Sequence, residues 1–92
     1  MDPKRVRVVV EGRVQGVGYR MFTRDLAARY GLNGWVKNRD DGKVEAAIEG
    51  PEEDVNSMIE GLYARDSYII RVDRVVIARE TPTGETGFEI RR

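Results

Sequence analysis

The chain has 92 residues, a length that predicts one domain, residues 1–92, with a modest core of its own. Sixteen Lys and Arg balance sixteen Asp and Glu, so the net charge is zero and we expect neither nucleic acid nor a membrane surface as partner. The sequence contains no Cys and no His, which excludes disulfides, thiolate phosphatases, phosphohistidine mechanisms, Ser-His-Asp triads and ordinary zinc sites.

The first third of the chain predicts a strand followed by a helix. Polar and apolar residues alternate over residues 5–11, as in a half-buried strand. One face of this strand carries three valines, Val6, Val8 and Val10. After a turn with two glycines, residues 20–30 carry apolar side chains at helical spacing. Gly31, followed by a leucine, is typical of a left-handed cap that ends such a helix.

The remaining elements are a hairpin, a second helix and two strands. Residues 34–39 and 43–49 flank an Asp-Asp-Gly turn, which predicts two strands joined as a hairpin. Pro51 and the three acids after it start a second helix, whose apolar stripe is Val55, Met58, Ile59 and Leu62. Residues 72–80 predict a strand and residues 88–90 a short final strand.

The order of these elements predicts an α+β fold. A β-α-β-β-α-β chain with right-handed crossovers forms a ferredoxin-like sandwich, a mainly antiparallel sheet with both helices on one face and here a short extra C-terminal strand. No apolar stretch nears the roughly 18 to 20 residues of a membrane helix, and the first residues lack the layout of a signal peptide. We therefore expect a cytoplasmic protein without a membrane partner.

The stretch VQGVGYR, residues 14–20, is a candidate phosphate-binding loop. Its glycines let backbone N–H groups converge with no Cβ in the way, and the start of the helix adds partial positive charge. The backbone donors would be those of Gln15, Gly16, Val17, Gly18 and Tyr19. Arg20 at the helix start could donate hydrogen bonds to two phosphate oxygens at once. Alternatively, the glycines only make a tight turn and Arg20 pairs with an acid such as Asp25.

The same loop does not fit the common nucleotide-binding motifs. It lacks the third glycine of a dinucleotide fingerprint and the Gly-Lys-Ser/Thr ending of a Walker loop.

Asn38 is the second candidate site residue. Strict alternation places it on the same face as Val36, the face that the helices are expected to cover. A buried carboxamide without partners costs about 1 to 3 kcal/mol, so it needs a role there. One interpretation is a turn residue that bonds its own backbone. The other is a side chain that holds a water molecule in a fixed orientation.

Two motifs give the chain a resemblance to a known family. GRVQGVGYR at residues 12–20 and GWVKN at residues 34–38, continued by Gly42, Val44 and Gly50, resemble the two signatures of the acylphosphatase family. Element order and length agree along the whole chain, although after Gly50 the match rests on short segments at residues 72–75 and 88–90. The chain departs from the family at residues 67–70, where the family commonly has a turn of small residues or proline.

The resemblance implies an enzyme that hydrolyses the carboxyl-phosphate bond of a small-molecule acyl phosphate without a metal or cofactor. It also implies that the loop amides of residues 15–19 and the guanidinium of Arg20 bind phosphate, while Asn38 orients the attacking water. This chemistry tolerates the absence of His, because a carboxylate leaving group needs little protonation and a loose transition state mainly needs charge and alignment. We expect a monomer.

Two other classes of protein remain as alternatives. An RNA-binding domain of the same architecture would display aromatic residues on its central strands, but residues 5–11 and 43–49 contain none. A non-catalytic sensor of phosphate or acyl phosphate would resemble the acylphosphatase-like domains found within larger proteins. The absence of an attached module after Arg92 favours a free-standing enzyme over such a sensor.

Overall fold

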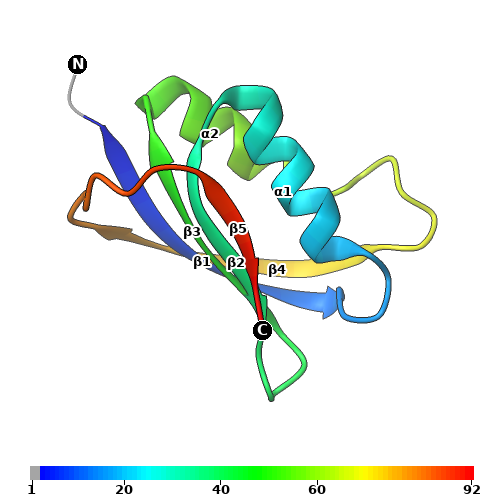
Figure 1. The fold of residues 1–92 in the computed structure, drawn as a ribbon. Helices are drawn as coiled ribbons and strands as arrows, with labels where there is room; N and C mark the ends of the chain where they lie inside the picture. Colours follow the sequence, from blue (N-terminus) through cyan, green and yellow to red (C-terminus); the bar gives the residue numbers. More distant parts are fainter. Residues whose placement is uncertain (1–2) are drawn as a thin grey trace.

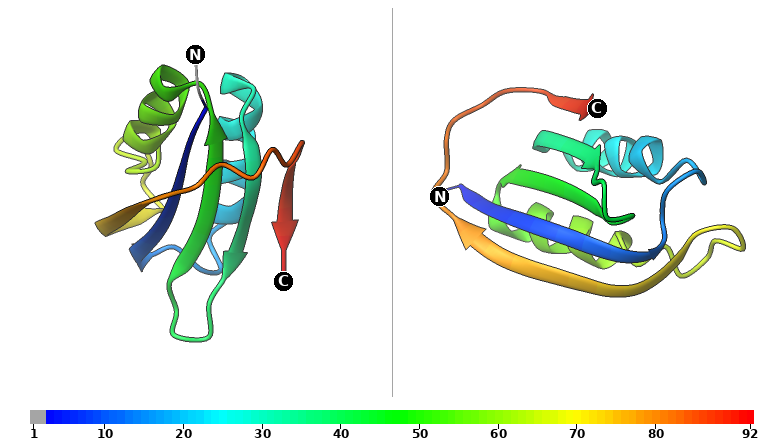
Figure 2. Two further views of the ribbon diagram at one scale, coloured as in Figure 1. Left: turned by 90° about the vertical axis from the view of Figure 1, so that its left-hand side faces the viewer. Right: turned by 90° about the horizontal axis from the view of Figure 1, so that it is seen from below.

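A computed structural model describes residues 3–92 of the chain (Figure 1). Its elements are β1 (Lys4–Arg13), α1 (Tyr19–Tyr30), β2 (Asn33–Asn38), β3 (Val44–Gly50), α2 (Glu52–Gly61), β4 (Arg71–Glu80) and β5 (Phe88–Arg91). The structure confirms the predicted fold class, with both helices on one face of a single sheet (Figure 2). Neither helix is long and apolar enough to cross a membrane within the described residues.

The strand order is β4-β1-β3-β2-β5, so β1 and β3 lie at the centre of the sheet. Every neighbouring pair is antiparallel except β2 and β5, which run parallel. Because β1 and β2 are both antiparallel to the β3 strand between them, they point in the same direction. The loop after β1 and the hairpin after β2 therefore leave the sheet at the same end.

The core lies between the sheet and the two helices. The valine face of β1 predicted from the sequence is fully buried there, together with Leu26 and Ala27 of α1 and Val55 and Met58 of α2. Gly61, a poor helix former, lies where the helices touch, since a Cβ at that position would come within 3.2 Å of Leu26. Its small size therefore permits the close approach of α1 and α2.

Tyr19 anchors the start of α1 in this core. Its side chain is buried, and its hydroxyl donates a hydrogen bond of 2.6 Å to the carbonyl of Leu62 at the end of α2. Burial raises the pKa of the Tyr19 hydroxyl, so it remains a donor. The last residue of the glycine loop is thus fixed by packing and by a hydrogen bond.

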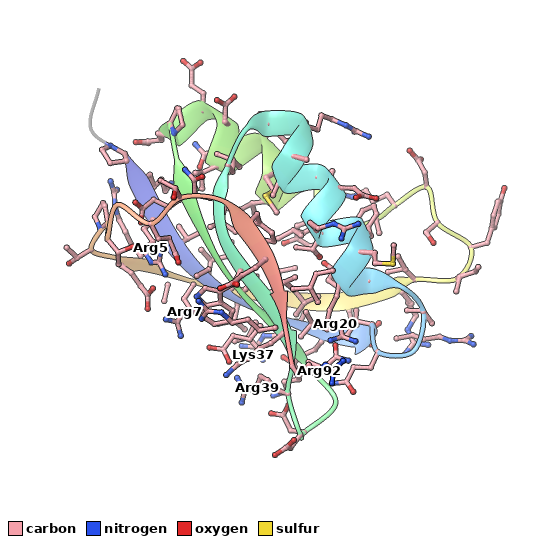
Figure 3. All side chains as sticks on the ribbon, viewed as in Figure 1. Arg5, Arg7, Arg20, Lys37, Arg39 and Arg92 are labelled. Carbon is pink, nitrogen blue, oxygen red and sulfur yellow. The ribbon has the colours of Figure 1, made fainter. Side chains whose placement is uncertain are left out.

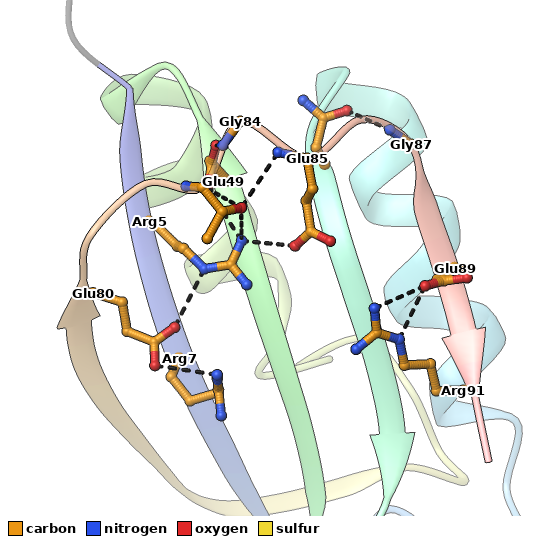
Figure 4. Close-up of polar contacts among 11 residues, drawn as sticks. Arg5, Arg7, Glu49, Glu80, Gly84, Glu85, Gly87, Glu89 and Arg91 are labelled. Carbon is orange, nitrogen blue, oxygen red and sulfur yellow. Dashed lines mark hydrogen bonds and ion pairs between the residues drawn. The ribbon is translucent and has the colours of Figure 1, made fainter.

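The face of the sheet away from the helices carries an ionic network around Arg5 (Figure 4). The Arg5 guanidinium lies 3.1 Å from Glu49, 3.3 Å from Glu80 and 2.7 Å from Glu85. Alternation correctly places Arg5 opposite the valines, yet it is only 5% exposed. The connection from β4 to β5 supplies the cover, because Thr83 and Glu85 in that connection both contact Arg5.

Glu49 holds this connection against the sheet. Its carboxylate accepts backbone N–H bonds from Thr83 at 2.9 Å and from Gly84 at 2.8 Å, as well as the bond from Arg5. Burial opposes ionisation of Glu49, but the two backbone donors and the Arg5 guanidinium together lower its pKa below the ordinary value of 4.5. The carboxylate form is therefore the native form.

This lowered pKa predicts sensitivity to acid. A group whose folded-state pKa is depressed contributes stability above its unfolded pKa, and the contribution is lost as the pH falls through the folded pKa. We expect Glu49→Gln to lower the melting temperature at about pH 7. The melting temperature of the native protein should fall as the pH is lowered from about 5 to 3, and this fall should be smaller in Glu49→Gln. Exposed Glu53 offers a matched control, since Glu53→Gln should keep the native pH dependence. If the melting temperature of Glu49→Gln fell as much at low pH as that of the native protein, the result would contradict the stabilising role of the Glu49 carboxylate.

Candidate active site

The sheet register brings the two sequence motifs together. Val44 at the start of β3 pairs with Val10 of β1 on one side and with Asn38 of β2 on the other. These three paired residues lie near the ends of β1 and β2. Residues 14–18 follow β1, and residues 39–43 follow β2 directly. The glycine loop and the Asn38 hairpin, distant in sequence, are therefore neighbours at one end of the sheet.

The glycine loop has the backbone shape that the sequence predicts. Gly16 and Gly18 adopt φ values of 73° and 77°, in the left-handed region that glycine tolerates best. Gly18 is the N-cap of α1, with no side-chain cap, and Phe22 makes the first helical bond back to its carbonyl at 3.0 Å. Within residues 3–92, no group accepts a hydrogen bond from the backbone N–H of residues 15–19. Five donors are thus available to a ligand at a helix start.

A cavity of about 180 Å³ opens beside this loop. Its lining residues are Val14, Gly16, Gly18, Tyr19, Arg20, Met21, Asn38 and Ile90. Arg20 is the one charged side chain in this lining, so the fixed charge at the cavity is positive. The structure thereby brings together Arg20, Asn38 and three of the five predicted loop residues. The remaining two, Gln15 and Val17, belong to the same loop but do not line the cavity.

Arg20 is held by the last strand rather than by an acid. Its Nη1 donates to the carbonyl of Arg91 in β5 at 3.2 Å, while Asp25, the alternative partner suggested by the sequence, lies 3.6 Å from Arg24. One of five guanidinium N–H groups is used in this way. The others remain available to an anion in the cavity.

Asn38 faces the same cavity from β2. Its side chain is half-buried, and among the described residues none hydrogen-bonds to its carboxamide. The interpretation of Asn38 as a turn residue bonded to its own backbone is therefore wrong. Asn38 also lines a second hollow of about 530 Å³, together with three basic and three acidic residues: Lys37, Arg39, Arg92, Asp40, Asp41 and Glu45. Figure 3 labels the three basic ones.

Three residues of the lining were not predicted as site residues: Val14, which directly precedes the predicted donors, and Met21 and Ile90. Met21 is 55% exposed on the first turn of α1, and Ile90 lies in β5, whose parallel pairing with β2 places it opposite Val36. Neither position carries a sequence signal for binding. A larger hollow of about 580 Å³, lined by α1, the end of α2 and the residues that follow it, contains none of the predicted site residues.

The fold and this cavity define a small α+β protein whose cavity is lined by a helix start, one arginine and one carboxamide. A family model for acylphosphatase matches residues 6–90. The chain is 52% identical over 91 residues to an acylphosphatase of Natronomonas pharaonis, covering 99% of this chain and 98% of the relative. The chain therefore belongs to the acylphosphatase family.

Solved structures agree with this assignment. The crystal structure of acylphosphatase from Bacillus subtilis superposes with a TM-score of 0.91 at 38% identity, covering 97% of this chain and 99% of that one. The HypF protein of T. kodakarensis contains a similar unit, with a TM-score of 0.84 and 36% identity over 97% of this chain but only 12% of its own length. The same fold thus occurs both as a separate protein and within a larger one.

Proposed function

We propose that this enzyme of the acylphosphatase family hydrolyses the carboxyl-phosphate bond of acyl phosphates in the cavity between the glycine loop and Asn38. The observation that carries the proposal is the set of unused donors that meet there. Gly16, Gly18, Tyr19 and Arg20 line one cavity together with Asn38. The backbone N–H groups of residues 15–19 have no acceptor among residues 3–92, and the carboxamide of Asn38 has no partner there either. Such a set suits a phosphate together with a water molecule.

In this proposal the phosphoryl group binds at the glycine loop. The loop donors and Arg20 stabilise the negative charge on its oxygens, and this stabilisation grows in a dry, preorganised site. Arg20 has the geometry for a bidentate contact, with its remaining N–H groups in a planar fork. The loop itself is rigid at its helical end, because Tyr19 is anchored in the core.

Asn38 then aligns the nucleophile. Its carboxamide oxygen accepts a hydrogen bond from water, so that a water lone pair faces phosphorus opposite the leaving oxygen. The new bond joins water oxygen to phosphorus, and the phosphorus-oxygen bond to the acyl group breaks, releasing a carboxylate. The water proton passes to a phosphate oxygen, so inorganic phosphate is the second product. These reaction steps need no general base from the protein.

The decisive experiment is hydrolysis of a simple acyl phosphate by the native protein, with and without excess chelator. We expect turnover in both conditions, since no three acidic side chains in residues 3–92 gather into a metal site and the cavity supplies fixed positive charge instead. Phosphate release and loss of the acyl phosphate should agree in amount. Binding of phosphate without any turnover would favour the sensor class, and turnover abolished by the chelator would contradict the metal-free mechanism.

A further inference from the structure

The side chain of Gln15 joins the two halves of the cavity. Its Nε2 donates to the carbonyl of Arg39 at 2.7 Å and to the carbonyl of Lys43 at 2.8 Å. Gln15 belongs to the glycine loop, whereas both carbonyls belong to the hairpin that follows Asn38. One carboxamide thus spans from one motif to the other.

The two acceptors lie at the neck of the hairpin. The Arg39 N–H donates to the Lys43 carbonyl at 2.8 Å, which closes the hairpin directly beyond β2. Gln15 adds its two N–H groups to carbonyls on both sides of this neck. Arg39 is the residue next to Asn38, so a shift of the neck moves Asn38 with it.

The geometry points to Gln15 as a positioning residue that sets the distance and angle between the phosphate loop and Asn38. This inference rests on the proposed function, because it concerns the alignment of phosphoryl group and water. Gln15 acts through Asn38 and does not touch substrate with its side chain. Its backbone N–H remains one of the five loop donors.

A glutamine fits this position for chemical reasons. The primary amide offers two donors in one plane, which matches two carbonyl acceptors. With the amide turned round, its oxygen would face two carbonyl oxygens, so the hydrogen-bond network fixes the orientation. A glutamate at this position would place a carboxylate there, which accepts but does not donate.

Loss of these two bonds should affect turnover more than phosphate binding. The loop keeps its shape at the other end, because Gly18 caps α1 and Tyr19 is bonded to Leu62. The hairpin keeps its own closing bonds. Only the connection between the glycine loop and the hairpin is lost. Misplacement of reacting groups by about 1 Å lowers the rate on the order of 10²-fold.

The first test is Gln15→Leu, which keeps side-chain bulk but removes both donors. We expect kcat to fall by roughly 10- to 100-fold, while the inhibition constant for inorganic phosphate changes by less than about threefold. Asn56→Ala is a matched control, since it removes a carboxamide that lies far from the cavity lining and accepts an exposed bond from Lys4. Melting curves check that each variant folds. A folded Gln15→Leu enzyme with native kcat would overturn the inference.

A second variant, Gln15→Glu, gives a pH signature that a purely structural role would not produce. Two carbonyl oxygens disfavour the carboxylate and raise the pKa of the new side chain above the ordinary value of about 4.3. Below that raised pKa the protonated carboxyl donates one bond again. We therefore expect the kcat of Gln15→Glu, relative to native, to recover partly as the pH falls. A constant ratio across pH would count against the inference even if Gln15→Leu failed to fold.

The double variant Gln15→Leu/Asn38→Ala separates positioning from independent effects. If Gln15 works through Asn38, adding Gln15→Leu to Asn38→Ala should change kcat by less than about threefold. If the kcat of the double variant instead fell by the product of the two single reductions, the result would overturn the inference. An inactive native protein would instead contradict the proposed function, so the two failures are distinguishable.

Discussion

Replacing Arg20 with alanine is expected to lower kcat/KM for a simple acyl phosphate by about 10³-fold or more. Arg20 is the one charged side chain in the lining of the cavity, so its removal leaves that lining without a positive side chain. The loss should appear in both KM and kcat, because in the proposed mechanism the guanidinium contacts phosphate in the ground state and in the transition state. The measurement is steady-state kinetics on acetyl phosphate or a similar substrate.

Two further variants sharpen this prediction. Arg20→Lys keeps the charge but lacks the bidentate fork, so it should retain part of the binding and little of the turnover. Arg24→Ala removes an exposed charge one turn further along α1, outside the cavity lining, and should stay within about twofold of native. Near-native kinetics in Arg20→Ala would remove Arg20 from the mechanism.

Replacing Asn38 with alanine is expected to reduce kcat by about 10² to 10³-fold while leaving the inhibition constant of inorganic phosphate within about threefold of native. In the proposed mechanism the loop and Arg20 contact the phosphate, whereas the carboxamide of Asn38 orients the water. This separation of binding from turnover distinguishes a water-orienting residue from a phosphate ligand. Phosphate inhibition and single-turnover measurements provide the two quantities.

Asn38→Asp is the informative companion of that variant. The added negative charge beside the bound phosphate should weaken phosphate binding as well as turnover, in contrast to alanine. Asn56→Ala again serves as the control for loss of a carboxamide. Full activity in Asn38→Ala would refute its assigned role, and equal losses of binding and turnover would make it a phosphate ligand.

Most of the fold could be predicted from the sequence because its signals are local. The alternating valines of β1, the glycine cap at Gly31 and the Asp-Asp-Gly turn each depend on neighbouring residues only. The burial of Arg5 could not be predicted in this way. It depends on a connection more than seventy residues later that crosses the open face of the sheet and is bonded to Glu49.

In the site, too, some features have local sequence signals and others depend on distant parts of the chain. The backbone conformation of the loop and the facing direction of Asn38 follow from glycine chemistry and strand alternation. The contribution of Ile90 depends on parallel pairing between β2 and a four-residue strand, which has no local signal. The side-chain contacts of Gln15 were also missed, because a glutamine in a loop is compatible with many partners and only the assembled hairpin selects two of them.

The dependence of the cavity on β5 has a consequence for the order in which the protein acquires its site. Domains emerge from the ribosome N-terminus first, so the glycine loop and the hairpin are synthesised well before Ile90 and Arg91. Until β5 is added beside β2, the Arg20 guanidinium lacks its carbonyl partner and the cavity lacks one wall. The cavity is therefore complete only after β5 has been made.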